Sequence, residues 1–261
     1  RDDVESRGLG DVYKRQMQSY ARYRKEKLKM SEQLNFDQII RNTNEGHLSC
    51  ALLLDTSGSM EGAAIRNLNS AIKQFKQDVC SDPDAKNRVD VALVTFNSEV
   101  NVINDFCPVT EMKTPELYAD GLTDMAAGIQ VALDLVKGRT RMYQKMGTPC
   151  HKPWIFMITD GKSTSLQSEM TEAANRIQAE ERKGANGHIN FWSIGVGNYD
   201  AQELYALSLK KRVVELSNMD FSGLFEFLSE SVIEISHSQV GEQVEFGPLP
   251  DNARELGGER Y

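Results

Sequence analysis

The sequence has few of the groups that form disulfides or bind soft metals. Its four cysteines are widely scattered, at Cys50, Cys80, Cys107 and Cys150. No CxxC pair occurs, and no cysteine–histidine cluster has the spacing of a zinc site. We therefore expect reduced thiols and a cytoplasmic protein without a disulfide framework.

Long apolar runs and excess positive charge are also missing. No run approaches the roughly 20 apolar residues of a membrane-spanning helix, and the first residues lack the apolar core of a signal peptide. The chain has 30 Lys and Arg against 38 Asp and Glu, a net charge of −8 at pH 7. Because such a surface repels nucleic acids and anionic membranes, we expect neither as a partner. An anionic ligand would need a local positive charge to hold it.

Residues 1–29 do not read as part of a folding unit. They hold nine Lys and Arg against five Asp and Glu, so the rest of the chain is more acidic still. The segment DVYKRQ, at 11–16, resembles the translation of a transposase end sequence used to prepare sequencing libraries. Met30 opens the more natural MSEQLNFDQII. We expect 1–29 to be a non-native leader, with a disordered native tail as the alternative, and 30–44 to be a lead-in.

The rest of the chain alternates strand-like and helix-like segments, which is typical of a parallel sheet covered by helices. Continuous apolar runs predict buried strands, and apolar residues at helical spacing predict helices. The predicted strands are 47–54, 89–96, 154–159, 189–196 and 213–216, and the predicted helices are 65–79, 125–136 with Thr123 as N-cap, 169–183, 201–208 and 221–235.

One more strand, VNVINDF at 100–106, follows the strand before it after a turn of three residues. That connection is too short for a crossover, so this strand should be antiparallel and lie at an edge. We predict a doubly wound α/β domain over 45–238, with a mostly parallel sheet, one antiparallel edge strand and helices on both faces. From about 239 the chain is rich in Gly, Pro and Glu, which predicts a flexible tail over 239–261 with one extended contact at 244–246.

Small polar side chains follow the buried strands where those strands end. Asp55, Ser57 and Ser59 in DTSGS follow the first strand, Thr123 lies in GLTDM before a helix, and Asp160 follows WIFMIT. In an open parallel sheet, ligands bind outside the carboxyl ends of the strands. All five side chains offer hard oxygen ligands, which suit Mg²⁺, Mn²⁺ or Ca²⁺ and argue against zinc and copper.

This order of motifs resembles the metal-ion-dependent adhesion site of von Willebrand factor A (vWA) domains. The resemblance implies a Rossmann-like vWA fold in which Asp55, Ser57 and Ser59 form the first metal loop. It also implies that Thr123 adds a hydroxyl and that Asp160 holds the ion through water. An Asp or Glu side chain of a partner protein would complete the shell, because the cation supplies the local positive charge.

Further segments resemble the bacterial TerY/YegL type of vWA protein: FDQI, RVDVALVTF, PWIFMITDG, WSIGVG and FSGLFEFLS. That type is cytoplasmic and is associated with tellurite resistance and the stress response. Its genes often neighbour kinase and phosphatase genes, so the resemblance implies a kinase or phosphatase as a partner to test.

Three alternatives stay open at this point. The motif DTSGS could be a plain strand-to-helix turn, because Asp and Ser cap helices and Gly58 fits a tight turn. The site could serve a Mg²⁺-dependent phosphoryl-transfer or hydrolytic enzyme that uses Asp55 or a metal-bound water. Phosphatases of that kind need a second acid where Ser57 stands, and no base accompanies the ligands, so a non-enzymatic binding module is the prediction. The third alternative is a scaffold whose metal is only structural.

Overall fold

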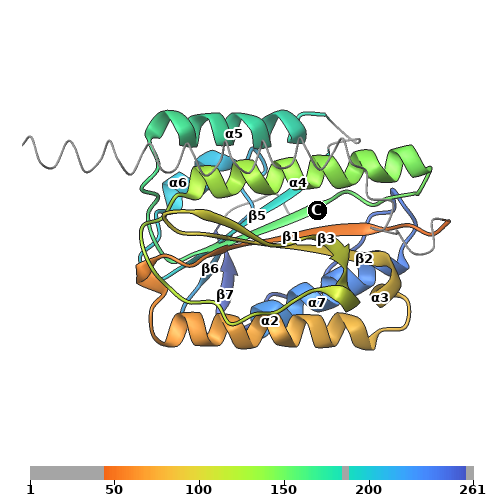
Figure 1. The fold of residues 1–261 in the computed structure, drawn as a ribbon, viewed down its shortest axis with the longest axis horizontal. Helices are drawn as coiled ribbons and strands as arrows, with labels where there is room; N and C mark the ends of the chain where they lie inside the picture. The colour runs from red at the N-terminus through yellow and green to blue at the C-terminus, as the bar shows by residue number, and fades with distance from the viewer. Residues whose placement is uncertain (1–43, 184–187, 257–261) are drawn as a thin grey trace, which may run out of the picture.

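The computed structural model describes residues 44–183 and 188–256. The predictions for the leader at 1–29 and for nearly all of the lead-in lie outside these residues. Seven strands form one sheet in the order β3-β2-β1-β4-β5-β6-β7, with helices above and below it (Figure 1). None of the helices in the described parts of the chain combines the length and the apolar character needed to cross a bilayer.

The middle of the sheet is parallel, as predicted. It consists of β1 (Leu48–Asp55), β2 (Val89–Phe96), β4 (Trp154–Thr159), β5 (Asn190–Val196) and β6 (Val213–Leu216). Every residue of β1, β2 and β4 is buried, which explains why these strands read as continuous apolar runs. The carboxyl ends of the parallel strands therefore meet at one edge, on the left in Figure 1.

Helices cover both faces of the sheet. One face carries α2 (Ala63–Ser81), α3 (Ala85–Arg88) and α7 (Ser222–His237), and the other carries α4 (Met125–Met146), α5 (Gln167–Glu181) and α6 (Ala201–Leu207) (Figure 1). Two short 3₁₀ turns, η1 (Gly58–Met60) and η2 (Val109–Glu111), complete the elements. The predicted doubly wound fold is confirmed.

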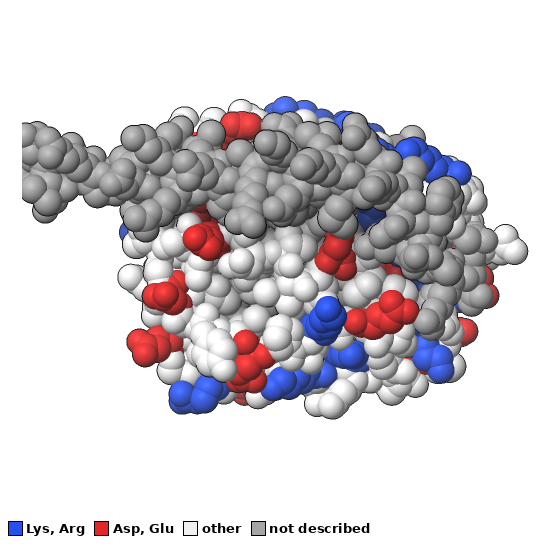
Figure 2. Space-filling view, in the orientation of Figure 1, with Lys and Arg blue, Asp and Glu red and all other residues white. Residues whose placement is uncertain are grey.

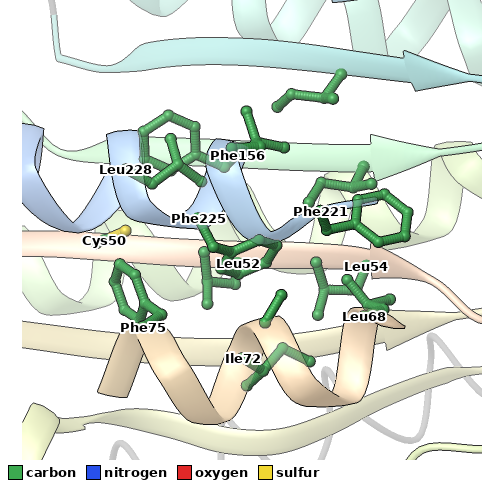
Figure 3. Packing of buried hydrophobic residues seen from close by; sticks show 14 of the residues in the cluster. Cys50, Leu52, Leu54, Leu68, Ile72, Phe75, Phe156, Phe221, Phe225 and Leu228 are labelled. Atoms are coloured by element: carbon green, nitrogen blue, oxygen red, sulfur yellow. The ribbon is translucent and has the colours of Figure 1, made fainter. Parts of the chain in front are cut away.

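Alternation along β1 builds the core on both faces at once. Leu52 and Leu54 belong to the cluster under α2 and α7, whereas Leu53 belongs to the cluster under α4. Figure 3 shows the first cluster, in which Leu52 lies near Phe225 of α7, whose ring is 6.2 Å from that of Phe75 of α2. Each fully buried Leu or Phe contributes about 1.5–3 kcal/mol. This packing holds the end of β1, and so Asp55, in a fixed place.

The strand at each edge of the sheet runs antiparallel to its neighbour. The strand β3 (Val100–Pro108) pairs with β2, as predicted from the short turn. The strand β7 (Ala253–Glu255) pairs with β6, and the sequence did not predict it. The predicted contact at 244–246 is present, because Val244 and Phe246 are partly buried against the core and the Phe246 ring lies 5.0 Å from that of Trp154.

The predicted N-cap of α4 is wrong. Asp124, not Thr123, caps this helix, and its Oδ1 accepts a hydrogen bond from Ala127 N at 3.3 Å. A carboxylate and a hydroxyl are both good caps, so the two neighbours could not be distinguished by residue type. The Thr123 hydroxyl is thereby available for another role.

Candidate metal centre

The first loop starts where β1 ends. The Asp55 side chain is completely buried, and its Oδ1 accepts a hydrogen bond from Ser57 N at 2.8 Å. The loop is anchored to the neighbouring strand by Thr56 N, which donates to Phe96 O at 2.9 Å. Asp55 and Ser57 are therefore held by the backbone rather than left as an open surface turn.

The third loop follows β4 and carries Asp160, and a serine hydroxyl of the first loop contacts it. Ser59 Oγ donates to Asp160 Oδ1 at 2.6 Å, and Ser57 Oγ lies 3.0 Å from Ser59 Oγ. The contact forms because β1 and β4 are parallel neighbours, with Leu54 beside Ile158, so their ends emerge together. The structure thus brings Ser59 together with Asp160, which is 101 residues away in the sequence, and places Ser57 beside Ser59.

The second loop carries Thr123 and is tied to both others. Gly58 N donates to Gly121 O at 3.0 Å, and Thr164 N donates to Thr123 O at 2.9 Å. Gly121 has φ +76°, a backbone conformation that favours glycine. A methyl group at Gly161 would lie 3.5 Å from Ser59 Oγ and 3.8 Å from Thr123 Oγ1, so both hydroxyls face the space above Gly161.

Thr159 is a site residue that the sequence analysis missed. Its Oγ1 donates to Asp55 Oδ2 at 2.6 Å, and the residue is fully buried. As the last residue of a predicted strand, it looked like an ordinary β-branched strand residue. Its place directly before Asp160, on the strand beside β1, is the signal that could have identified it.

The two acids share a buried environment. Asp55 has no exposed surface and Asp160 is 4% exposed. Burial raises the pKa of both carboxyls; hydrogen bonds from Ser57 and Thr159 partly offset this for Asp55, and the nearby Asp160 charge raises its pKa further. No ion pair with a basic side chain is formed by either acid within the described residues.

This donor set fits a hard divalent cation. Buried carboxylates without a counter-charge are costly, and a cation between them would offset that cost. In the described ranges no group of three or more His, Cys, Asp or Glu side chains is arranged to hold a metal. A cation here would therefore depend on serine and threonine hydroxyls in addition to the two carboxylates, which suits Mg²⁺, Mn²⁺ or Ca²⁺.

Comparison with known families agrees with this arrangement. The family model of the von Willebrand factor type A domain, VWA, matches residues 50–229. The chain belongs to the VWA family. VWA domains are typically protein-interaction modules, and they bind a divalent metal at their adhesion site. No curated protein sequence matches the chain significantly.

Solved structures share the VWA fold at low sequence identity. The pilus adhesin SpaC from Lactobacillus rhamnosus GG has a TM-score of 0.58 and 12% identity, over 74% of this chain and 31% of SpaC. Proximal thread matrix protein 1 from the mussel byssus has a TM-score of 0.51 and 16% identity, over 81% of this chain and 49% of that protein.

The vWF domain of the type V pili tip protein Mfa5 from Porphyromonas gingivalis has a TM-score of 0.52 and 12% identity, over 77% of this chain and 99% of that domain. The chain spans about half the length of the mussel protein and less than a third of SpaC. At these identities the likeness is one of fold alone.

Proposed function

We propose that this VWA domain binds a partner protein through a divalent cation, which is Mg²⁺, with Mn²⁺ or Ca²⁺ as alternatives. An Asp or Glu side chain of the partner would complete the coordination shell. The observation that carries the proposal is a pair of buried acids that meet two serine hydroxyls and have no basic partner in the described residues. The residues that would hold the cation are Asp55, Ser57, Ser59, Thr123 and Asp160.

The existing hydrogen bonds prepare this site for a cation. Asp55 is fixed by Ser57 N and Thr159 Oγ1, so its carboxylate has little freedom to lose when it binds. The Ser59 hydroxyl donates its hydrogen to Asp160 and can accept a hydrogen bond from Ser57 Oγ, which leaves one lone pair of its oxygen for a cation. A bound cation supplies the positive charge that lets an acidic domain hold an acidic ligand.

The setting that we propose follows the TerY/YegL resemblance. The protein would act in the cytoplasm of a bacterium, in a tellurite-resistance or stress-response system, and its partner would be a kinase or phosphatase encoded nearby. The acidic composition supports a protein partner rather than a nucleic acid or a membrane.

Affinity capture with the purified domain tests the proposal. We expect a partner from the source cell to be retained with Mg²⁺ and to be lost with a chelator. We expect the same loss for Asp55→Ala, and retention for Asp120→Ala, which removes an exposed acid on the neighbouring loop. Capture that is insensitive to the chelator and to Asp55→Ala would contradict cation-dependent binding. If chelation lowers stability but leaves capture unchanged, the metal is only structural.

A phosphatase assay tests the enzymatic alternative. Among the described residues, the polar side chains that hydrogen-bond to Asp55 and Asp160 are the hydroxyls of Ser57, Thr159 and Ser59, and none is a base. His47 immediately precedes β1 and so lies at the amino end of that strand, whereas Asp55 lies at its carboxyl end. We expect no Mg²⁺-dependent hydrolysis of p-nitrophenyl phosphate. Turnover that disappears in Asp55→Ala would replace the binding proposal with an enzymatic one.

A further inference from the structure

Large apolar side chains are exposed on the loops that carry the candidate ligands. In the described parts of the chain, Tyr118 is 77% exposed, Leu122 is 44% exposed and Leu166 is 50% exposed. Leu122 directly precedes Thr123, and Leu166 is in the loop that follows Asp160. Exposed apolar groups of this size are costly to hydrate, and a cluster of them marks an interaction surface.

Hydrogen bonds tie the loops that carry these three residues to the loops of the candidate centre or to their neighbours. Tyr118 lies two residues before Asp120, whose N donates to Thr56 O at 2.9 Å in the first loop. Leu122 N donates to Ser98 Oγ at 2.8 Å. Leu166 follows Ser165, whose Oγ donates to Asp124 Oδ1 at 2.8 Å beside the second loop. The side chains are thus displayed on loops that are tied to one another and to the first metal loop.

The other exposed large apolar side chains in the described residues lie elsewhere. Met146 ends α4, a helix of 22 residues that starts beside Thr123, so about 33 Å of helix separates them. Leu209 precedes β6 and Val240 follows α7, which places both near the amino ends of the parallel strands, away from the candidate centre. Met146 and Leu209 have exposures close to those of Leu122 and Leu166, and they provide matched controls.

The charges around the centre point to the kind of partner. Glu61, Glu99 and Asp120 are exposed on the loops that surround it, and the exposed Lys162, in the loop after Asp160, is paired with Asp200 at 3.7 Å. Figure 2 shows mainly acidic side chains near the left edge of the visible face, the edge where β1 and β4 end. An acidic rim repels an acidic ligand everywhere except at the cation. The rim therefore disfavours further acidic groups on the partner segment, and the exposed apolar side chains offer contacts to uncharged ones.

We propose that Tyr118, Leu122 and Leu166 form an apolar collar around the site. The collar docks a partner segment in which an Asp or Glu side chain is flanked, within two residues, by large apolar or aromatic side chains. The inference rests on the proposed function, because the coordinated carboxylate sets the place of the segment. Buried aromatic and aliphatic anchors next to one charged contact are typical of the residues that dominate binding energy.

A peptide array tests the collar. The probes are seven-residue peptides with a central Asp, whose flanking positions carry Leu, Phe, Tyr, Ser, Gly or Lys, and a parallel set with central Asn. With Mg²⁺, we expect the parent domain to retain Asp peptides with Leu, Phe or Tyr flanks and to release their Asn counterparts. For the best-retained peptide, we expect Tyr118→Ser, Leu122→Ser and Leu166→Ser each to weaken binding about tenfold.

Control variants distinguish a failure of the collar from a failure of the metal site. Met146→Ser and Leu209→Ser should bind the peptide as the parent does, and all five variants should keep the Mg²⁺-induced rise in melting temperature. The collar is wrong if the parent retains Asp peptides without a preference for apolar flanks, or if it retains no peptide. It is also wrong if the three collar variants bind the peptide as well as the parent does. If the parent shows no Mg²⁺-induced rise, it is the proposed metal site that fails.

Discussion

The Thr159 hydroxyl donates a hydrogen bond of 2.6 Å to Asp55 Oδ2, from the last residue of one strand to the last residue of its neighbour. The bond joins two residues that are 104 positions apart and fully buried. It leaves Asp55 with one oxygen held by a side chain and the other by the Ser57 amide. The position of this carboxylate is therefore decided by the sheet and not by the loop alone.

Replacement of Thr159 by Val should lower the stability of the domain and weaken its response to Mg²⁺. Val has nearly the same shape, but it leaves one oxygen of the buried carboxylate without a donor, which costs about 1–3 kcal/mol of unfolding free energy. We expect a lower urea midpoint and a smaller Mg²⁺-induced rise in melting temperature. Thr56→Val is the matched control, because Thr56 Oγ1 donates to Phe96 O at 3.4 Å and, within the described residues, to neither acid of the centre, so the Mg²⁺ response should persist.

Mg²⁺ should stabilise the parent domain by binding the native state alone. At about 100 times Kd the gain is about 2.7 kcal/mol, which raises the melting temperature of a domain of this size by roughly 5–10 °C. Asp55→Ala and Asp160→Ala should abolish the rise, because each removes one of the two carboxylates. Differential scanning fluorimetry with and without a chelator measures it. A parent protein that does not respond to millimolar Mg²⁺ would rule out a functional site.

Replacement of Asp160 by Asn should change the stability of the domain differently with and without Mg²⁺. Asp55 and Asp160 are both buried, and removal of one charge relieves the repulsion on the other. We expect Asp160→Asn to be as stable as the parent or more stable in a chelator, and less stable than the parent in Mg²⁺. Urea unfolding in the two buffers gives both values. If Asp160→Asn is less stable than the parent in both buffers, the two acids do not repel each other as inferred.

A second buried acid, Asp90, should make the domain sensitive to low pH. Its Oδ2 lies 2.7 Å from Arg139 and 3.3 Å from His47 Nδ1, and Tyr143 donates its hydroxyl to the same atom. Burial alone would raise the pKa of Asp90, but these hydrogen bonds and the Arg139 charge together lower it. A lowered carboxyl pKa stabilises the fold above the unfolded pKa, so that stability is lost as the pH falls through the folded pKa.

Asp90→Asn should therefore cost about 3–5 kcal/mol at pH 7, because it leaves the Arg139 charge buried and unpaired. The variant should also lose less stability than the parent between pH 5 and pH 2. Urea unfolding across that pH range tests both statements. Asp134→Asn, which removes the charge that pairs with Arg176 where the two side chains are 27% and 23% exposed, should cost only about 0–1 kcal/mol. Equal costs for the two substitutions would show that burial does not decide the effect.

Gly195 should tolerate no side chain while Tyr199 keeps its place. A methyl group at this position would lie 2.4 Å from Tyr199 Cδ2, and the two nearest further contacts are also ring atoms of Tyr199. We expect Gly195→Ala to cost about 1–3 kcal/mol. The double variant with Tyr199→Ala should cost less than the sum of the single ones, because the clash disappears. Additive costs in urea unfolding would show that the ring is not the obstacle.

Most of the strands were predictable because burial on both faces leaves a simple signal. The bounds of β2, β4 and β6 agree with the predicted segments, and β1 differs by one residue at each end. The strand β7 was not predictable, since Ala-Arg-Glu is short and polar and is a strand only because the β6 edge accepts it. Tertiary pairing decided that element, and no local pattern indicates it.

The candidate site was predictable in composition but not in its supports. Asp55 ends β1, Ser57 and Ser59 follow it, and Asp160 follows β4, so sheet geometry alone brings these residues together. Thr159 and Gly121 were not singled out, because one is a typical strand residue and the other an ordinary loop glycine. Their roles depend on a hydrogen bond across strands and on a positive φ, and both are properties of the folded chain.

The position of β1 in the sheet affects how the chain is made. During synthesis β1 and β2 emerge early, but the partner on the other side of β1 is β4, which begins about 100 residues later. At ribosomal rates of about 5–20 residues per second, the second edge of β1 stays unpaired for several seconds. The apolar run that ends in Asp55 is then open to pairing with other chains. Chaperone demand in the cell is therefore expected to be greatest while the ribosome translates the segment between β2 and β4.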